Sequence, residues 1–379
     1  MTYPYEPMDA PALTSPDDSG WQQRLRVALQ HSLGLTDDNT LLVVWDGRSP
    51  RGLVDDLLSV GSTVARTASL VHYVPTSRLP QSRLCYFAQA ALGETRQLPE
   101  PVAAAMAGAD RIVLVLSDLE VLFSARVGAI ADSDRRLIMF PYSDIPGIRR
   151  LLPASADEAD ALAEFTTAIG GLVAEAHTAR VTSPAGTDLT WAFGPDFTCI
   201  YGGRASRGEI QILPGGQVSR MPREGTANGT VVIDRTIAHG DYKALTEAIT
   251  LTVREGYVVD IQGGEDASYL ASFLAGLDDP AAYHLTELGV GLNPRCHHTG
   301  TNAPAEDTHA LGTCSFALGC DSHLGGVVGA RVHIDMTMHQ PTVEIDGRTL
   351  IGGGRFADIP EEAQRHLSRL EQSFAAEPS

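Results

Sequence analysis

The sequence has too few basic residues for a large class of partners. Its 379 residues carry 28 lysines and arginines against 47 aspartates and glutamates, which gives a formal charge of −19. Nucleic-acid binding needs a basic surface, and so does docking on an anionic membrane. The charge argues against both partners. It fits a self-repelling cytoplasmic protein.

Long apolar runs and a secretory leader are also missing. No stretch approaches the roughly 20 apolar residues that span a bilayer. Residues 1–20, MTYPYEPMDAPALTSPDDSG, have neither the basic start nor the apolar centre of a signal peptide. They are rich in proline, aspartate and serine, so we expect a flexible N-terminal arm.

Cysteine is scarce, and its spacing argues against a disulfide framework. The five cysteines are an odd number without a Cys-x-x-Cys pair, so a reducing compartment fits. Cys314 and Cys320 are weak candidates for metal ligands, and we expect them to be small buried residues. The sequence also lacks a Gly-x-Gly-x-x-Gly run and a P-loop, so a nucleotide site is unsupported.

Residues 21–180 predict an α/β domain. Short apolar runs that end in turn residues are typical of strands buried on both faces, and helical patterns lie between them. Strands that alternate with helices favour a mostly parallel sheet. The predicted strands are TLLVVWDG (40–47), SLVHYVP (69–75), RIVLVLSD (111–118) and RLIMFPYSD (136–144).

Residues 181–379 predict a second, β-rich α+β domain. Its strand-like segments are bounded by glycine, with a few helical patterns such as EEAQRHLSRLEQSF (361–374). Glu255-Gly256 and Asp346-Gly347 each separate two alternating runs, which is typical of a tight hairpin turn. A chain of this length is comfortable for two domains.

The stretch RVHIDMTM (331–338) suggests a metal site. Apolar and polar residues alternate along it, which predicts a half-buried strand. His333 and Asp335 then lie on the same face, close enough to share one cation. A third ligand must come from a neighbouring element, and we choose His284, which begins another strand-like segment.

Three interpretations fit this constellation. Two histidines and one carboxylate on one side of a metal form the facial triad of non-haem iron(II) oxygenases, which leaves positions open for substrate and dioxygen. A zinc site with the same ligands is a rival. A solvated polar strand face needs no metal. Spacing alone does not separate the three.

The second half resembles the aminopeptidase T family and its oxygenase relatives, the 2,5-dihydroxypyridine dioxygenases. The matching motifs run in order from about residue 202 to 353, and the N-terminal half fits only in architecture. The resemblance implies an aminopeptidase T-like metal-binding domain. The motifs are LPGGQVSRMPREGTANGTVVI, LTVREGYVVDIQGG, HLTELGVGLNP, EDTHALGTCSFALG and VHIDMTM.

The two branches of this family differ at the metal. The peptidase branch resembles a two-metal hydrolase, but two of its ligand positions hold Gln217 and Ser315 here, and neither is a strong ligand. Glu287 and the pair in VHIDMTM are kept. Resemblance to the dioxygenase branch implies a single Fe(II) held by that pair and His284.

The implied function is an iron(II)-dependent, extradiol-type dioxygenase that opens a hydroxylated pyridine-like or other hydroxylated aromatic ring with dioxygen. Glu287 and Ser315 are predicted to act in catalysis, and Gln217 and His323 to bind the substrate. The alternatives are an aminopeptidase T-like metallopeptidase and a non-catalytic metal-binding protein of the same fold. The sequence does not decide which histidine is the acid or base among His297, His298, His309 and His323.

The subunit arrangement bears on the substrate. In the pyridine dioxygenases, the resemblance implies, a histidine from the first domain of a neighbouring subunit reaches the site. The corresponding segment here, LEVLFSARVGA (119–129), contains none. The identity of the substrate ring is therefore undecided. We expect a homo-oligomer in which a neighbouring subunit completes the site.

Overall fold

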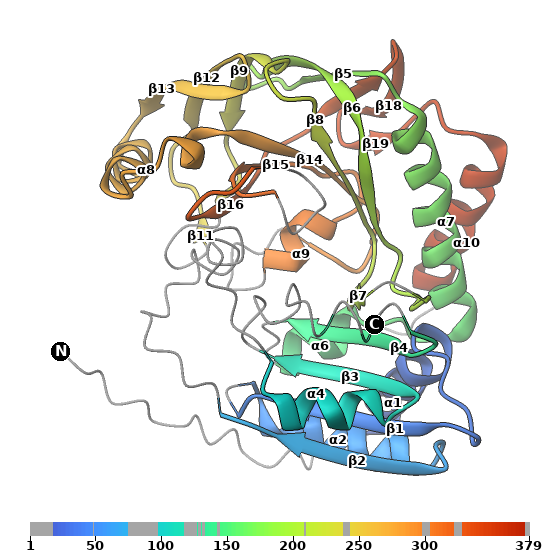
Figure 1. The fold of residues 1–379 in the computed structure, drawn as a ribbon. Helices are drawn as coiled ribbons and strands as arrows, with labels where there is room; N and C mark the ends of the chain where they lie inside the picture. Colours follow the sequence, from blue (N-terminus) through green and yellow to red (C-terminus); the bar gives the residue numbers. More distant parts are fainter. Residues whose placement is uncertain are drawn as a thin grey trace.

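The computed structural model describes residues 18–47, 49–74, 98–116, 127, 130, 133–141, 145–207, 210–237, 243–297, 304–321 and 328–375. A parallel sheet lies in the lower half of the view in Figure 1, and a larger antiparallel sheet lies above it. Most of the predicted N-terminal arm lies outside the described residues. So do His298, His323 and most of the segment 119–129.

The four predicted strands of the first half form one parallel sheet, which confirms that part of the expected fold. The strand order is β2-β1-β3-β4-β7, and every pairing among these described strands is parallel. The strands are β1 (Thr40–Trp45), β2 (Thr67–His72), β3 (Arg111–Leu116), β4 (Arg136–Pro141) and β7 (Ile210–Ile212).

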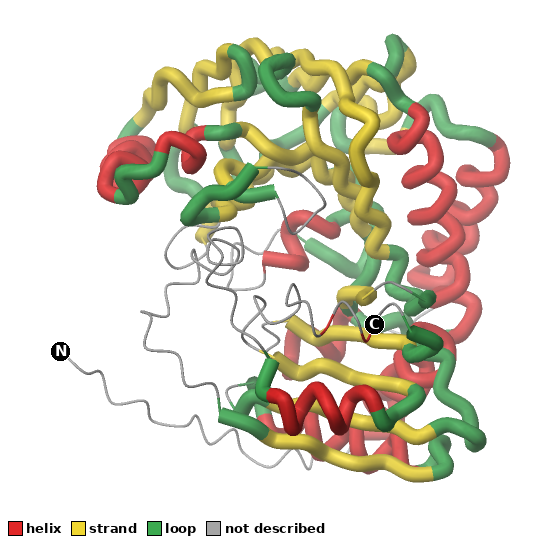
Figure 2. The backbone as a smooth tube through the Cα atoms, in the orientation of Figure 1, coloured by secondary structure: helices red, strands yellow, loops and turns green. Residues whose placement is uncertain are grey.

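Helices cover both faces of this sheet, as continuous apolar strands require. One face is covered by α1, the π-helix η1 and α2. The other face is covered by α4. Figure 2 shows these helices around the lower sheet. The helical elements are α1 (Asp18–Val27), η1 (Ala28–Ser32), α2 (Arg51–Ser62), α4 (Glu100–Ala107) and α6 (Ile145–Leu151).

The second sheet is antiparallel and carries the metal-site motifs. Its order is β11-β10-β16-β15-β14-β8-β6-β5-β17-β18-β19, and β9, β12 and β13 pair beside this path. The strands from the first half of this region are β5 (Thr178–Thr182), β6 (Asp188–Tyr201), β8 (Gln217–Pro222), β9 (Asn228–Ile233), β10 (Thr236–Ile237), β11 (Lys243–Ala244) and β12 (Ile249–Arg254). Those that follow are β13 (Tyr257–Gly263), β14 (Leu285–Gly291), β15 (Cys314–Gly319), β16 (His333–Thr337), β17 (Thr342–Ile345), β18 (Arg348–Gly352) and β19 (Arg355–Phe356).

Both predicted hairpin turns are present. Glu255 and Gly256 have φ values of 50° and 83°, and Asp346 and Gly347 have φ values of 47° and 77°. Two successive left-handed residues match the twist of the flanking strands. The turns therefore fix the pairing of β12 with β13 and of β17 with β18.

Long helices cover one side of the antiparallel sheet (Figures 1 and 2). α7 begins where the Ser155 hydroxyl accepts the Glu158 N–H, and it buries Phe165 and Ile169 in the core of this sheet. α10 packs along α7, where Arg369 pairs with Glu164. The remaining helical elements are α7 (Ala156–Glu175), α8 (Glu265–Gly276), η4 (Pro280–Tyr283), α9 (Pro304–His309) and α10 (Glu361–Ala375).

Two elements cross the boundary that the sequence predicts near residue 180. α7 precedes that residue but packs in the core of the antiparallel sheet. β7 follows it but pairs with β4 in the parallel sheet. The two halves of the chain are therefore interlocked, and the division at residue 180 stays a prediction.

Candidate metal centre

The cross-strand register gathers polar side chains on one face of the antiparallel sheet. Asp335 lies opposite Ala317, and Gly289 lies between Ser315 on β15 and Ser219 on β8. Because side chains alternate along each strand, the other face is apolar and packs in the core. The polar face presents Gln217, Ser219, Glu287, Ser315, His333, Asp335 and Thr337.

Most of this polar face is closed to water, unlike the half-buried strand that the sequence predicts, and only the Asp335 side chain is partly exposed, at 21%. His333 is 7% exposed and Thr337 is fully buried. The short helix α9 packs on β14 and β16 and covers them. A buried imidazole beside the buried Glu287 carboxylate needs compensation that a solvated strand face does not, so the interpretation of a solvated polar face does not hold for His333 and Glu287.

Three side chains converge on the polar face. The Nε2 atom of His333 lies 3.2 Å from the Asp335 Oδ1 atom and 3.6 Å from the Glu287 Oε2 atom. One ligand atom from each side chain lies within 4.8 Å of the others. This donor set, one imidazole and two carboxylates, suits a divalent cation of the first transition row.

The imidazole of His333 is oriented for a ligand role. Its Nδ1 atom donates to the Cys320 carbonyl oxygen at 2.7 Å, which leaves Nε2 directed at the two carboxylates. Metal-ligating histidines are commonly fixed in this way through their second nitrogen. Burial lowers the pKa of His333, but Asp335 and Glu287 outweigh it and raise the pKa to about 9. A proton therefore occupies the position where a cation would bind.

Glu287 is held between the cluster and β8. The Ser219 hydroxyl donates to its Oε1 atom. Burial, together with the negative charge of Asp335, raises the pKa of Glu287 to about 7. Ser219 was not among the residues predicted from the sequence, although it lies two positions after Gln217 and so on the same strand face.

Gly289 leaves a space that several predicted site residues surround. A Cβ atom on Gly289 would lie 2.2 Å from Ser315 Oγ and 3.1 Å from both Gln217 Nε2 and Glu287 Oε1. The Ser315 hydroxyl is buried and has no hydrogen-bond partner among the described residues. The structure thus brings Gln217, Glu287 and Ser315 together, as a shared site requires.

His284 lies near the cluster but outside it. The Gly319 N–H donates to the His284 carbonyl at 2.8 Å, and Gly319 lies opposite His333. The His284 ring, however, packs edge-on against Tyr257, with centroids 5.0 Å apart. Both ring nitrogens are buried without a hydrogen-bond partner in the described part of the chain, and burial lowers the pKa of His284.

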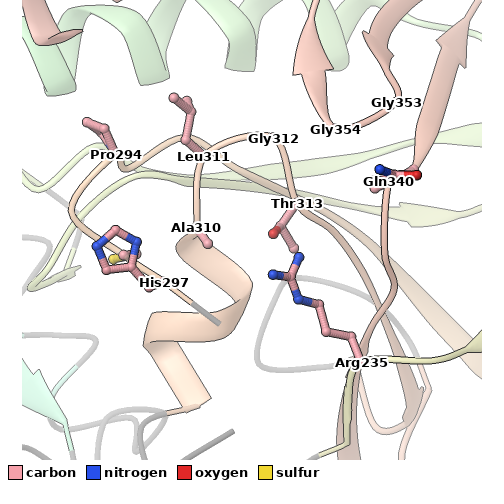
Figure 3. Close-up of a pocket in the computed structure, with 12 residues that line it drawn as sticks. Arg235, Pro294, His297, Ala310, Leu311, Gly312, Thr313, Gln340, Gly353 and Gly354 are labelled. Atoms are coloured by element: carbon pink, nitrogen blue, oxygen red, sulfur yellow. The ribbon is translucent and has the colours of Figure 1, made fainter. Parts of the chain in front are cut away.

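The cysteine candidates and His297 do not belong to the three-residue cluster. Cys314 and Cys320 are fully buried and free of disulfides, and neither belongs to the three-residue cluster. His297 is exposed and lines a cavity of about 510 Å³ at the C-terminal end of α9. In Figure 3 the Arg235 side chain reaches toward Thr313 in this cavity. Of the residues singled out from the sequence, its lining contains only His297, an acid or base candidate.

Comparison with known proteins decides the family. A sequence model described as 2,5-dihydroxypyridine 5,6-dioxygenase matches residues 21–358. The chain belongs to the 2,5-dihydroxypyridine 5,6-dioxygenase family. A curated member from Pseudomonas putida KT2440 is 27% identical over 261 residues, which cover 66% of this chain and 72% of that protein. The dioxygenase branch that the sequence favours is therefore confirmed, and the chain is a ring-cleaving dioxygenase.

Solved structures agree on the fold. The 2,5-dihydroxypyridine dioxygenase from P. putida KT2440 superposes with a TM-score of 0.74 at 20% identity and covers 92% of this chain and 100% of its own. AmpT from Thermus thermophilus gives a TM-score of 0.56 at 18% identity, with 89% and 99% covered. The expected aminopeptidase T-like architecture is thereby confirmed. No helix in the described residues is long and apolar enough to cross a bilayer.

Proposed function

We propose that this chain uses iron(II) and dioxygen to open a hydroxylated pyridine-like or other hydroxylated aromatic ring in an extradiol-type reaction. The observation that carries the metal assignment is the cluster of His333, Asp335 and Glu287, whose ligand atoms lie within 4.8 Å of one another and in which His333 and Glu287 are buried. Membership in the 2,5-dihydroxypyridine 5,6-dioxygenase family supports the substrate class. When bound, iron(II) supplies a Lewis acid with open coordination positions.

We propose His333 and Asp335 as two ligands and His284 as the third. Both ring nitrogens of His284 are buried without partners among the described residues, and a cation bound at one of them would recover part of that cost in free energy. Leu285 packs in the core, and in this proposal the residue before it, His284, faces the opposite side of the chain. In this assignment the His284 ring turns away from Tyr257.

Glu287 is not a ligand in this assignment, so it can act as a general base beside the ligands. A ring hydroxyl must lose its proton to react, and a general base works best with a pKa near the operating pH. The carboxylate of Glu287, whose Oε2 atom lies 3.6 Å from Nε2 of His333, is placed to take such a proton. Ser219 holds the carboxylate in place through its hydroxyl.

Ser315 and Gln217 orient the ring in this proposal. Both side chains border the space at Gly289, and the Ser315 hydroxyl has its hydrogen-bonding capacity unused among the described residues. A hydroxyl and an amide offer donors and acceptors to the polar atoms of a flat ring. His323, outside the described residues, stays a predicted substrate contact, and the homo-oligomer stays a prediction.

The reaction can be tested directly. Protein purified without oxygen should hold about one iron per chain, and under air it should bleach the absorbance of 2,5-dihydroxypyridine while consuming oxygen. Both atoms of ¹⁸O-labelled dioxygen should appear in the opened product. Turnover that proceeds equally well without oxygen would contradict the proposal, as would two tightly bound zinc or cobalt ions with release of N-terminal residues from peptides.

A further inference from the structure

His309, at the end of α9, is a buried histidine that the proposed chemistry does not use. It is 2% exposed. Its Nδ1 atom lies 2.9 Å from the Pro214 carbonyl oxygen, and its Nε2 atom lies 2.9 Å from an amide atom of Gln217 placed as Oε1. The ring therefore connects the LPGG loop to a side chain that borders the proposed substrate space.

The chain around His309 is tightly packed, so the ring has little freedom. A Cβ atom on Gly291 would lie 2.2 Å from the Ala310 carbonyl oxygen, which shows how closely the end of α9 approaches β14. The Asn293 N–H donates to the His309 carbonyl at 2.8 Å, and the Asn293 side chain donates to the Gly215 carbonyl. Asn293 thus holds the backbone of both His309 and Gly215, the residue after Pro214.

Counting protons gives the orientation of the Gln217 amide. A carbonyl oxygen only accepts hydrogen bonds, so the Pro214 contact requires a proton on Nδ1 of His309. A neutral ring then has only a lone pair at Nε2, and its partner must be a donor. Burial lowers the pKa of His309 to about 4, so the ring is neutral at pH 7. The amide oxygen and nitrogen have the same shape, and the hydrogen-bond network assigns them.

We infer that His309 is a positioning residue that holds the Gln217 amide with its NH₂ group toward α9 and its carbonyl oxygen toward Ser315. With the amide in this orientation, the oxygen takes the place 3.1 Å from the Cβ position that Gly289 lacks. Ser315 Oγ borders the same space. The site then presents a fixed acceptor at this point.

A fixed hydrogen-bond acceptor in the site would select one class of substrate. This inference about the substrate rests on the proposed function. Ring-opening substrates with an N–H or O–H donor at this position should be favoured, because a buried acceptor left unpaired is costly. The pyridone form of a hydroxylated pyridine has such an N–H group. A benzenediol has only a C–H at the position of the ring nitrogen.

The proton positions can be measured in the intact protein without any substrate. In ¹⁵N-labelled protein at pH 7, the His309 ring, identified by its absence in His309→Phe, should show a protonated Nδ1 and an unprotonated Nε2. A doubly protonated ring, or a proton on Nε2 alone, would overturn the inference. This result does not depend on whether the ring-opening reaction occurs.

Kinetics test the consequence. The wild-type preference for 2,5-dihydroxypyridine over benzene-1,4-diol, as a ratio of kcat/KM values, should fall about tenfold in His309→Phe. In a Gln217→Glu background, where either oxygen can face the ring, the same change should have a much smaller effect. An unchanged preference in folded His309→Phe, or equal effects in both backgrounds, would contradict the positioning role. Wild-type protein that is inactive on both 2,5-dihydroxypyridine and benzene-1,4-diol would contradict the proposed function. In that case the measurement of the His309 ring protons alone decides the role of His309.

Discussion

The Nε2 atom of His333 and the Oδ1 atom of Asp335 lie 3.2 Å apart, two residues along one strand. Both side chains are on the face of the antiparallel sheet that α9 covers. Removal of Asp335 leaves the buried His333 ring without its nearest carboxylate, and removal of either residue removes a proposed metal ligand.

Asp335→Asn should lose bound iron while the protein stays folded. The amide keeps the shape of the carboxylate but lacks its charge, and hard or borderline cations bind anionic oxygen more strongly. Metal analysis together with circular dichroism measures both properties. The matched control is Asp260→Asn on exposed β13, which should keep its iron. Full iron occupancy in Asp335→Asn would remove Asp335 from the ligand set.

Paired variants separate the two candidates for the third ligand. His284→Ala should lose iron, whereas Glu287→Gln should keep iron and lose about 10²–10⁴-fold in kcat because a general base is removed. Iron content and single-turnover rates distinguish the two effects. The opposite pattern, with iron lost only in Glu287→Gln, would make Glu287 the third ligand, as its position in the cluster also allows.

Gly289→Ala should disturb the site more than an alanine elsewhere. Its new Cβ atom would meet Ser315 Oγ at 2.2 Å, and overpacking of this kind typically costs about 1–3 kcal/mol. Urea unfolding should show the loss, and adding Ser315→Ala should recover part of it. Gly276→Ala, where nothing lies within 4 Å, is the control and should be close to neutral. Equal stability of the two single variants would mean that the Gly289 space is not closely bordered.

His309 should make the folded protein sensitive to mild acid. Burial lowers its pKa from the ordinary 6.5 to about 4, so the folded ring binds fewer protons than the unfolded ring. The contribution of the neutral His309 ring to the free energy of unfolding is therefore complete above pH 6.5 and is lost as the pH falls toward 4. The whole change in the free energy of unfolding is at most on the order of 3 kcal/mol. Unfolding free energies at pH 7 and pH 5 should differ less in His309→Phe than in the wild type. The same pH dependence in both proteins would contradict this assignment.

Local patterns predicted the elements with strong periodic signals. The four apolar runs form β1 to β4. The Glu255-Gly256 and Asp346-Gly347 pairs form tight turns, which require two residues with left-handed backbone. The i, i+2 spacing also placed His333 beside Asp335, since a strand fixes that geometry by itself. These features depend on residues close together in the chain.

Features that depend on tertiary pairing could not be predicted in the same way. The bulge between Leu285 and Glu287 changes which residues of β14 face the cluster, and a bulge leaves no periodic signal in a short strand. β7 lies in one of the glycine-bounded segments predicted as strands, but its parallel pairing with β4 is a tertiary contact that the local pattern does not reveal. The burial of β16 under α9 likewise depends on a segment distant in sequence.

The exchange of α7 and β7 between the two halves has a consequence for how the chain is made. On the ribosome, the parallel sheet cannot acquire its last strand until β7 has been synthesised, well after β4. α7 in turn must wait for α10, almost at the C-terminus, before its outer side is covered. A fragment cut at residue 180 would therefore lack β7 on one side of the cut and α7 on the other.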